Sequence, residues 1–360
     1  MAGFRFTVQL SGAPTGAAWR DLARKVEDLG YSTLYVPDHL DGQWGPLVAL
    51  TVAAEATTAL TVGSLVFDND FRHPCVLAKE LASLDLASSG RFEFGLGAGW
   101  MHTDYETSGL AFDAASVRIS RMEEALQIYQ QLFSGTPATF HGEHYQVNNA
   151  TLTPEPHTPG GPPLVIGGGS RRVLTLAGKY ASIVSMVPSL AAGAIGPEVA
   201  AGGVADAYLE RLSWVKDGAG SRFDDLELQI WTAFAQITDD ATSVFEAMGP
   251  MFGLTAEQVR SAPVALCGSV PEVIDQLEER RATFGFSNIV LRTKGSSKPS
   301  PPWWPHSLVG DRGAGRPARW HLRPTPSGPP RPRTGRTPQR HRRRCRVHGG
   351  RRSVPEAGER

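Results

Sequence analysis

Short apolar segments alternate with longer amphipathic segments along most of the chain. This alternation predicts strands that each pass into a helix before the next strand begins. The expected strands are residues 4–10, 33–36, 60–67, 91–96, 164–166, 183–186, 226–235 and 286–291. The expected helices cover residues 17–29, 46–57, 74–87, 117–133, 171–179, 203–216, 240–260 and 271–284. Residues 134–161, rich in Pro, Gly and Thr, read as a long irregular connection.

Eight strands separated by helices imply a parallel sheet, and this length favours a (β/α)8 TIM barrel with insertions. The rival fold is a doubly wound open sheet, which carries a dinucleotide fingerprint after its first strand. Ser11, Gly12, Ala13, Pro14 and Thr15 stand there instead and do not form that fingerprint. The sequence therefore favours the closed barrel.

The formal net charge of zero hides two unlike parts. Residues 311–360 carry 15 Arg, no Lys and three acidic residues, a charge of +12, so the preceding 310 residues carry −12. An acidic body with a basic end predicts a folded unit followed by a tail. We expect a barrel domain over residues 1–293 and a disordered Arg/Pro-rich tail over residues 294–360.

Other features of composition exclude several protein classes. The body is rich in Ala, Val, Leu and Gly, which excludes fibrous and wholly disordered classes. Cys75, Cys267 and Cys345 lie too far apart for a disulfide framework or a metal-ligand spacing. Neither a signal peptide nor a membrane-spanning segment is expected, so the sequence predicts a cytoplasmic protein.

Candidate chemistry begins at the end of the second strand, because active sites of parallel barrels lie at the carboxyl ends of the strands. Asp38 and His39 follow Pro37 there. They could place a proton-transfer group and its partner over a bound ligand. Alternatively, Asp38 caps a turn and His39 is merely exposed.

Two glycine-rich segments follow later strands. Gly95-Leu96-Gly97-Ala98-Gly99-Trp100 could let a flat ring or a phosphate approach the backbone, or could form a tight turn. Gly167-Gly168-Gly169-Ser170 leads into a helix that begins with Arg171 and Arg172. The amino end of that helix and its basic pair favour phosphate binding over a mobile loop.

The segment after the third strand, residues 67–74, places Asp68, Asn69 and Asp70 among aromatic residues. These polar side chains could line a pocket. Two carboxylates this close also resemble a metal-ligand pair, but no other cluster supports a metal. We therefore expect no metal site.

Taken together, these motifs resemble the luciferase-like monooxygenase superfamily. More narrowly, they are similar to its bacterial deazaflavin (coenzyme F420)-dependent oxidoreductases. The resemblance covers about residues 3–292. It rests on the ordered segments Val36-Pro37-Asp38-His39, Phe71-Arg72-His73-Pro74, Leu77-Ala78-Lys79-Glu80, Leu84-Asp85, Ser89-Gly90-Arg91-Phe92, Gly95-Leu96-Gly97-Ala98-Gly99-Trp100, Pro163-Leu164-Val165-Ile166-Gly167-Gly168-Gly169, Ala177-Gly178-Lys179-Tyr180-Ala181 and Leu266-Cys267-Gly268-Ser269.

The resemblance implies a barrel that holds a hydride carrier at its carboxyl face. The phosphate tail of this carrier would meet Gly167–Ser170, and its ring would lie over the end of the third strand. There the resemblance implies a non-proline cis peptide at Leu65–Val66. Other cofactor-binding candidates at these strand ends are Asp68, Gly97, Ala98 and Gly99.

Asp38 and His39 match the Asp-His pair of the sugar-phosphate dehydrogenase branch, where the His is the proposed base. That branch has Glu where Trp100 stands, so its substrate is not carried over. Ser182 also stands where many relatives have Asp. Trp44 and Trp100 are candidates for the substrate pocket.

The expected activity is hydride transfer between coenzyme F420 and a small organic substrate. The alternatives are an FMN-dependent monooxygenase of the same superfamily and a protein that binds the cofactor without turnover. We expect a small-molecule substrate and neither a specific nucleic-acid partner nor a membrane, and we leave a homodimer open.

The resemblance stops near Arg292. Relatives continue into a helix containing a sequence like Ala-Pro-Val-Val-Ala, and a shifted reading frame of Pro301-Pro302-Trp303-Trp304-Pro305 can encode Pro-Val-Val-Ala. We infer a lost reading frame between about residues 292 and 300. The rival interpretation is a functional basic tail that binds polyanions.

Overall fold

The structure is a computed structural model that describes residues 3–190, 193, 199 and 201–292. The chain divides into two units, Met1–Asp311 and Arg312–Arg360, and every described residue belongs to the first. The domain boundary expected at residue 293 and the expected tail both lie outside the described residues.

The first unit is built around one closed parallel sheet. Its strands follow the order β3-β2-β1-β13-β10-β9-β8-β5-β4, and a further pairing of β3 with β5 closes the ring. The predicted (β/α)8 barrel is therefore confirmed. The bounds are β1 (Arg5–Gln9), β2 (Thr33–Val36), β3 (Thr61–Ser64), β4 (Phe67–Asp68), β5 (Phe92–Gly97), β8 (Leu164–Gly168), β9 (Ile183–Met186), β10 (Glu227–Trp231) and β13 (Phe286–Arg292).

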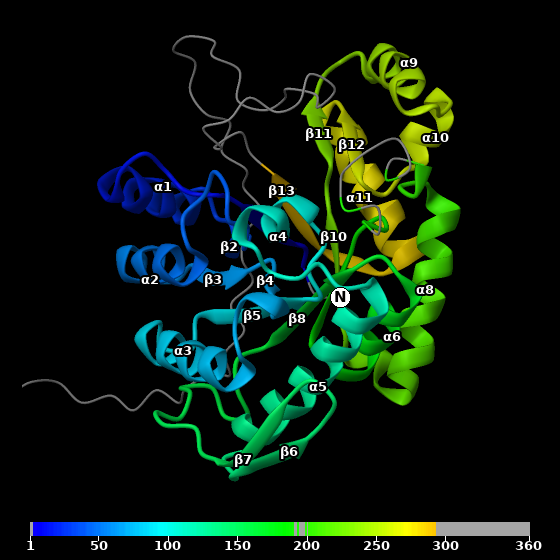
Figure 1. Cartoon of the computed structure of the whole chain (residues 1–360). Helices are drawn as coiled ribbons and strands as arrows, with labels where there is room; N and C mark the ends of the chain where they lie inside the picture. Colours follow the sequence, from blue (N-terminus) through cyan, green and yellow to red (C-terminus); the bar gives the residue numbers. More distant parts are fainter. Residues whose placement is uncertain (1–2, 191–192, 194–198, 200, 293–360) are drawn as a thin grey trace, which may run out of the picture. The chain divides into compact units, whose positions relative to one another are not determined.

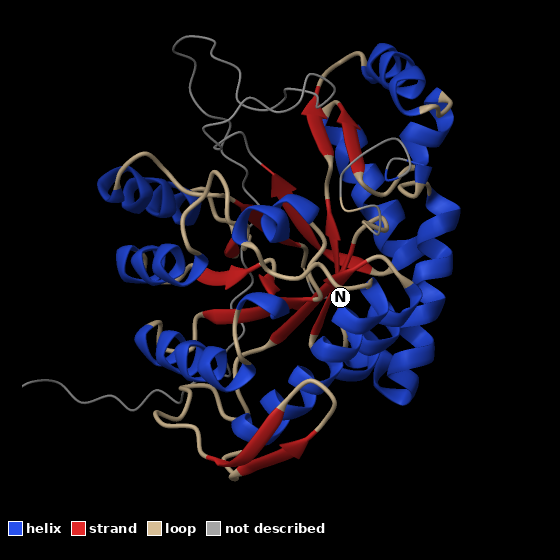
Figure 2. Ribbon diagram, in the orientation of Figure 1, coloured by secondary structure: helices blue, strands red, loops and turns tan. Residues whose placement is uncertain are grey.

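Helices surround the sheet (Figures 1 and 2). They are α1 (Gly16–Asp28), α2 (Pro46–Ala56), α3 (Pro74–Ala87), α5 (Ala115–Phe133), α6 (Arg171–Tyr180), α8 (Ala205–Ala219) and α11 (Val270–Phe284). Local signals explain their starts, since Thr15 caps α1 and proline occupies the first turn of α2 and α3. None of the described helices is long and apolar enough to cross a bilayer.

The expected third strand, residues 60–67, is divided into β3 and β4. The Leu65–Val66 peptide between them is cis, as the resemblance implied. The Val66 side chain lies against β5 and β8, where a Cβ on Gly97 would come within 2.5 Å of it and one on Gly167 within 3.2 Å. Glycine at these two positions gives Val66 the room it needs.

The second half departs further from the sequence prediction. The single strand expected over residues 226–235 is wrong, because β10 ends at Trp231 and β11 (Phe234–Ile237) pairs with β12 (Ala265–Gly268). With α9 (Ala241–Phe252) and α10 (Ala256–Ser261), these strands surround a separate apolar cluster. These four elements lie between β10 and α11 in the sequence, and Figure 1 shows them projecting from the barrel.

Two further elements were not predicted. The connection expected to be irregular contains an antiparallel hairpin of β6 (Ala138–His141) and β7 (Gln146–Ala150). The short helix α4 (His102–Ser108) follows β5 near the carboxyl end of the barrel. It has one buried acidic residue, Asp104, and one buried aromatic, Tyr105, which is too little apolar surface to give a periodic signal.

At the other end, the amino-terminal ends of the strands enclose a polar layer. Arg5 on β1 contacts Glu93 on β5 at 2.5 Å and Glu227 on β10 at 2.8 Å. Since β1 and β5 are not neighbours in the sheet, the first contact crosses the barrel interior. Tyr35 donates a hydrogen bond to Glu93 and accepts one from Gln229. This layer closes the barrel with ion pairs and hydrogen bonds, although Oε1 of Gln229 has no hydrogen-bond partner among the described residues.

Candidate active site

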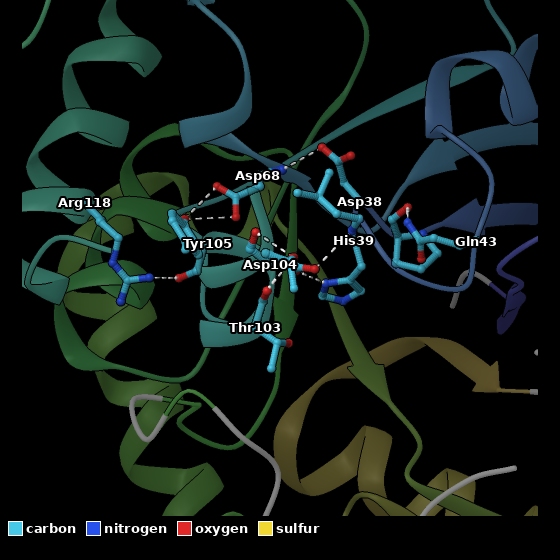
Figure 3. A network of polar contacts seen from close by, with 12 residues as sticks. Asp38, His39, Gln43, Asp68, Thr103, Asp104, Tyr105 and Arg118 are labelled. Carbon is cyan, nitrogen blue, oxygen red and sulfur yellow. Dashed lines mark hydrogen bonds and ion pairs between the residues drawn. The ribbon is translucent and has the colours of Figure 1, made fainter. Parts of the chain in front are cut away.

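The sequence-predicted site residues gather at the carboxyl ends of β2, β4, β5 and β8. This is the end of a parallel barrel at which binding and catalytic groups collect. Figure 3 shows Asp38, His39, Asp68, Asp104 and Tyr105 in one network of polar contacts. The strand order therefore brings together groups that lie far apart in the sequence.

Asp38 and His39 turn to different partners. Asp38 forms an ion pair with Arg72, with 2.5 Å between Oδ2 and the guanidinium, and accepts the backbone N–H of Asp68 at 3.1 Å. The Asp38 side chain is 3% exposed. The mutual pairing expected from the sequence is thus replaced by two separate contacts, and Asp38 connects β2 to the segment after β4.

His39 bonds through Nδ1 to Oδ2 of Asp104 at 2.7 Å, and its side chain remains 24% exposed. The indole of Trp100 meets the imidazole edge to face, with 5.6 Å between ring centroids. In the described part of the chain, no hydrogen bond engages Nε2. His39 therefore has one nitrogen held by a carboxylate and one available at the mouth of the barrel.

Asp104 was not identified from the sequence, although it follows Trp100 by only four positions. Its Oδ1 accepts the backbone N–H of Leu40 at 3.0 Å, and its side chain is 4% exposed. Burial alone raises the pKa of this carboxyl, but the hydrogen bonds from His39 and Leu40 outweigh burial and hold the pKa below its usual range. Asp104 is therefore a carboxylate near neutral pH.

Asp68 has a contrasting environment. The Tyr105 hydroxyl lies 3.1 Å and 3.2 Å from its two oxygens and donates to Asp70 at 3.0 Å. The pKa of Asp68 is raised to about 7, chiefly by burial and also by the charges of Asp70 and Asp38, although the hydrogen bonds from the Asp70 N–H and Tyr105 oppose the rise. A carboxyl with this pKa can hold or release a proton near neutrality.

Two arginines of α5, also missed by the sequence analysis, support this cluster. Arg121 contacts Asp70 at 2.8 Å and also pairs with Asp113. Arg118 donates to the carbonyl of Gly99 at 2.8 Å and lies over the ring of Phe112. Arg118 and Arg121 of α5 therefore hold the residues of the loop after β5 in place through these contacts.

The glycines of this loop fit closely against protein atoms. A Cβ on Gly99, whose φ is +73°, would come within 1.9 Å of the Tyr105 hydroxyl and 2.7 Å of an Asp68 oxygen. The Val66 side chain occupies the space that a side chain at position 97 would need. Packing within the protein therefore already requires glycine at both 97 and 99. A role for Gly97, Ala98 and Gly99 in cofactor binding stays a prediction.

The second glycine segment leads into α6. A Cβ on Gly168 would meet Val173 at 2.4 Å, and one on Gly169 would meet the carbonyl of Val187 at 2.3 Å. Ser170 occupies the cap position of α6, but its side chain makes no capping hydrogen bond. Its hydroxyl and the first N–H groups of the helix remain available to a ligand.

The two arginines at the start of α6 differ in their contacts. Arg172 reaches α5, where it donates to the Ser116 carbonyl at 2.9 Å and pairs with Glu123 at 3.1 Å. Arg171 is exposed, and no polar partner reaches it among the described residues. An open hollow beside α6 is lined by Glu123, Arg171, Arg172, Thr175 and Leu176. Arg171 is therefore the available cation of the pair.

Trp44 lies beside the loop after β1. Its indole N–H donates to the carbonyl of Ala13 at 2.9 Å, and its ring packs against Trp19. Trp100 contacts His39 directly. A pocket role for both tryptophans stays a prediction. In the described ranges, no group of three or more His, Cys, Asp or Glu residues could hold a metal ion.

Comparison with known proteins gives two informative relatives. The chain is 31% identical over 175 residues to the 4-hydroxyprotoasukamycin monooxygenase of Streptomyces nodosus subsp. asukaensis, covering 46% of each protein. It is 31% identical over 169 residues to the F420-dependent glucose-6-phosphate dehydrogenase of Nakamurella multipartita, covering 45% of this chain and 49% of that protein. The chain thus matches about half the length of these curated relatives.

The fold is similar to that of the coenzyme F420 dependent tetrahydromethanopterin reductase from Methanopyrus kandleri. The TM-score is 0.64 at 19% identity, over 81% of this chain and 94% of the reductase. A sequence profile described as luciferase-like monooxygenase matches residues 1–206. That match spans more than half of the 360 residues and includes the site from Asp38 to Ser170. The chain belongs to the luciferase-like monooxygenase family, whose homologues indicate an enzyme.

Proposed function

We propose that this enzyme transfers a hydride between coenzyme F420 and a small organic substrate. The observation that carries the proposal is the free Nε2 of His39 at the barrel mouth, where Nδ1 is already held by Asp104. The 31% identity to an F420-dependent dehydrogenase supports the choice of cofactor. A cytoplasmic location and a homodimer remain predictions.

The chain offers residues suited to both ends of such a cofactor. Leu65 and Val66 connect β3 to β4, and Val66 lies against Gly97 at the end of β5. Together with Ala98 they would support the ring. At the other end, the uncapped hydroxyl of Ser170 and the N–H groups of α6 would receive a phosphate. Arg171 would add a positive charge there.

The bound deazaflavin would supply a carbon that accepts or gives up a hydride. Removing a hydride from an alcohol carbon requires a proton to leave the oxygen, and adding one to a carbonyl carbon requires a proton to reach it. We assign that proton to Nε2 of His39. Asp38 would serve the site by holding Arg72 and the backbone of Asp68, while Trp44 and Trp100 would border the substrate.

A second candidate is an FMN-dependent monooxygenase. It is supported by the 31% identity to a relative named as a monooxygenase. The phosphate end of the site would suit FMN equally well, since both cofactors carry a phosphate. The two candidates differ in the ring and in the need for oxygen, so they can be separated by experiment.

Cofactor titration tests the proposal directly. We expect coenzyme F420 to quench tryptophan fluorescence at lower concentration than FMN. In an anaerobic screen, we expect oxidised F420 to be turned over with small alcohols or reduced F420 with carbonyl compounds. Preference for FMN with oxygen-dependent turnover would favour the monooxygenase. Binding of F420 without turnover of any substrate would favour a carrier.

Two variants of α6 test the phosphate assignment. Arg171→Ala should weaken binding of F420 by about three- to tenfold, because one charge-assisted contact is lost. The matched control is Lys179→Ala, which removes the same charge at the other end of α6, where Lys179 lies against Tyr180. Equal effects of both variants would contradict a specific phosphate site.

A further inference from the structure

We propose that Asp104 is a positioning residue that keeps the His39 proton on Nδ1 and so presents an unprotonated Nε2 to the substrate. This inference rests on the proposed role of His39. It adds a residue on another element, the short helix α4, that sets which ring nitrogen can act. The wider consequence is that the reactive unit is His39 with Asp104, in place of His39 with its neighbour Asp38.

The first support is the way Asp104 is held. Its two carboxylate oxygens have separate partners, Oδ2 with Nδ1 of His39 at 2.7 Å and Oδ1 with the backbone N–H of Leu40 at 3.0 Å. Its own N–H donates to the Met101 carbonyl at 3.1 Å, and it lies in the first turn of α4. Figure 3 shows the carboxylate pointing at the imidazole. A side chain held at both oxygens has little freedom to turn away.

The second support is the charge of the partner. A carboxylate accepts hydrogen bonds and has no proton to give, so Nδ1 of His39 must be the donor in this contact. The second ring nitrogen of a neutral imidazole is then the acceptor. The backbone N–H of Leu40 supplies a further positive dipole that keeps Asp104 ionised.

The third support is the set of groups around the imidazole. Trp100, in the loop after β5, meets the ring at an interplanar angle of 86° and restricts its rotation. On the adjacent elements, Asp38 pairs with Arg72 and accepts the backbone N–H of Asp68, and the Asp68 carboxyl meets the Tyr105 hydroxyl. Among the charged side chains in the described part of the chain, Asp104 is the one that contacts the His39 ring.

Substitution by asparagine makes a sharp test. In Asp104→Asn the N–H of Leu40 still requires an acceptor, so the amide oxygen should stay with Leu40 and the amide NH2 should face Nδ1. Nδ1 must then accept, which moves the proton of the neutral ring to Nε2. The tautomer should therefore reverse while the shape of the site is kept.

The direct readout is the pair of 15N chemical shifts of His39 in the cofactor-free chain with labelled histidine, assigned by comparison with His39→Gln. The intact chain should show a protonated Nδ1 and an unprotonated Nε2 in the neutral ring, and Asp104→Asn should show the reverse. The matched control is Glu106→Gln, an exposed acid-to-amide change on the same helix, 3.6 Å from His102. It should leave the His39 shifts unchanged.

Protonated Nε2 in the intact chain would overturn the proposal, and this measurement needs no variant to fold. An unchanged tautomer in a folded Asp104→Asn protein would also overturn it. In turnover assays Asp104→Asn should lower kcat by at least about 10²-fold, as loss of the productive tautomer does elsewhere, with KM and cofactor affinity within about twofold.

The two proposals fail differently. Should His39→Ala keep full turnover, the assigned role of His39 is wrong, whereas the tautomer measurement still decides whether Asp104 positions the ring. Should His39→Ala lose turnover and Asp104→Asn keep it despite a reversed tautomer, the positioning role is wrong and the proposed function stands.

Discussion

The barrel has a polar cluster at each end, and the two differ in how completely their buried carboxyl groups are paired with cations. At the amino-terminal end, Arg5 lies between Glu93 and Glu227, so charge meets opposite charge across the interior. Burial would lower the pKa of Arg5, but the two glutamates outweigh it and the pKa is raised. The guanidinium of Arg5 is therefore stabilised in its charged form.

At the carboxyl end Asp38 and Asp70 have arginine partners, but no cation pairs with Asp68 in the described part of the chain. Asp68 is buried beside Asp70 and near Asp38, and its pKa rises to about 7. His39 keeps one nitrogen free, and Ser170 leaves its hydroxyl out of the helix cap. The difference teaches that a buried carboxyl without a cationic partner has a raised pKa, and that such a group beside a free imidazole marks where a ligand is expected.

The largest effect should come from removing the free imidazole at the mouth. His39→Ala should lower turnover by roughly 10²–10⁴ while cofactor affinity is nearly kept, as expected when a proton-transfer group is lost. Steady-state kinetics together with a fluorescence titration measure both quantities. Full turnover in this variant would show that His39 does not transfer the proton and only lines the pocket.

Removing the paired cation at the other end should instead affect stability. Arg5→Met leaves Glu93 buried without its cation and should lower the free energy of unfolding by about 3 kcal/mol, measured by urea denaturation. The control is Arg24→Met on α1, whose partner Asp21 is exposed, with an expected loss below about 1 kcal/mol. Equal losses in both variants would contradict the structural role of the interior layer.

The raised pKa of Asp68 predicts a pH dependence of stability. Below about pH 4 the carboxyl is protonated in both states. Between about pH 4 and 7 the unfolded chain releases the proton while the folded chain keeps it, so stability falls as pH rises, and above pH 7 the cost is constant.

Asp68→Asn removes this titration. Its stability relative to the intact chain should therefore be greater at pH 8 than at pH 5, by about 2–3 kcal/mol as an upper value. Denaturation curves at the two pH values measure the difference. Asp28→Asn, at the exposed end of α1, is the control and should show no such change.

The smallest effect separates packing from ligand approach at Gly168. Gly168→Ala should weaken cofactor binding by about tenfold, but its Cβ would also press on Val173 at 2.4 Å. The double variant Gly168→Ala/Val173→Ala relieves that contact within the protein. Affinity that stays low in the double variant supports phosphate approach, and restored affinity assigns the effect to packing.

Local sequence patterns determined most of the barrel. The eight expected strands fall at the eight positions of the closed sheet, because each buried strand is a short apolar run. Four of the outer helices, α1, α2, α3 and α11, also begin at a cap residue or a proline. The prediction fails where one continuous apolar segment forms two strands that pair with different neighbours. Residues 226–235 look like one strand, yet their first half pairs within the barrel and their second half pairs with β12.

The site divides in the same way. The sequence alone placed His39 at a strand end and the glycine segments at two others, because strand ends can be recognised from local pattern. Only the tertiary structure decided the partners: Asp38 turned to Arg72, and His39 met Asp104, 65 positions away. Adjacent residues in extended chain point in opposite directions, so neighbours in sequence seldom share a contact, and the closure of the barrel selects which distant side chains meet.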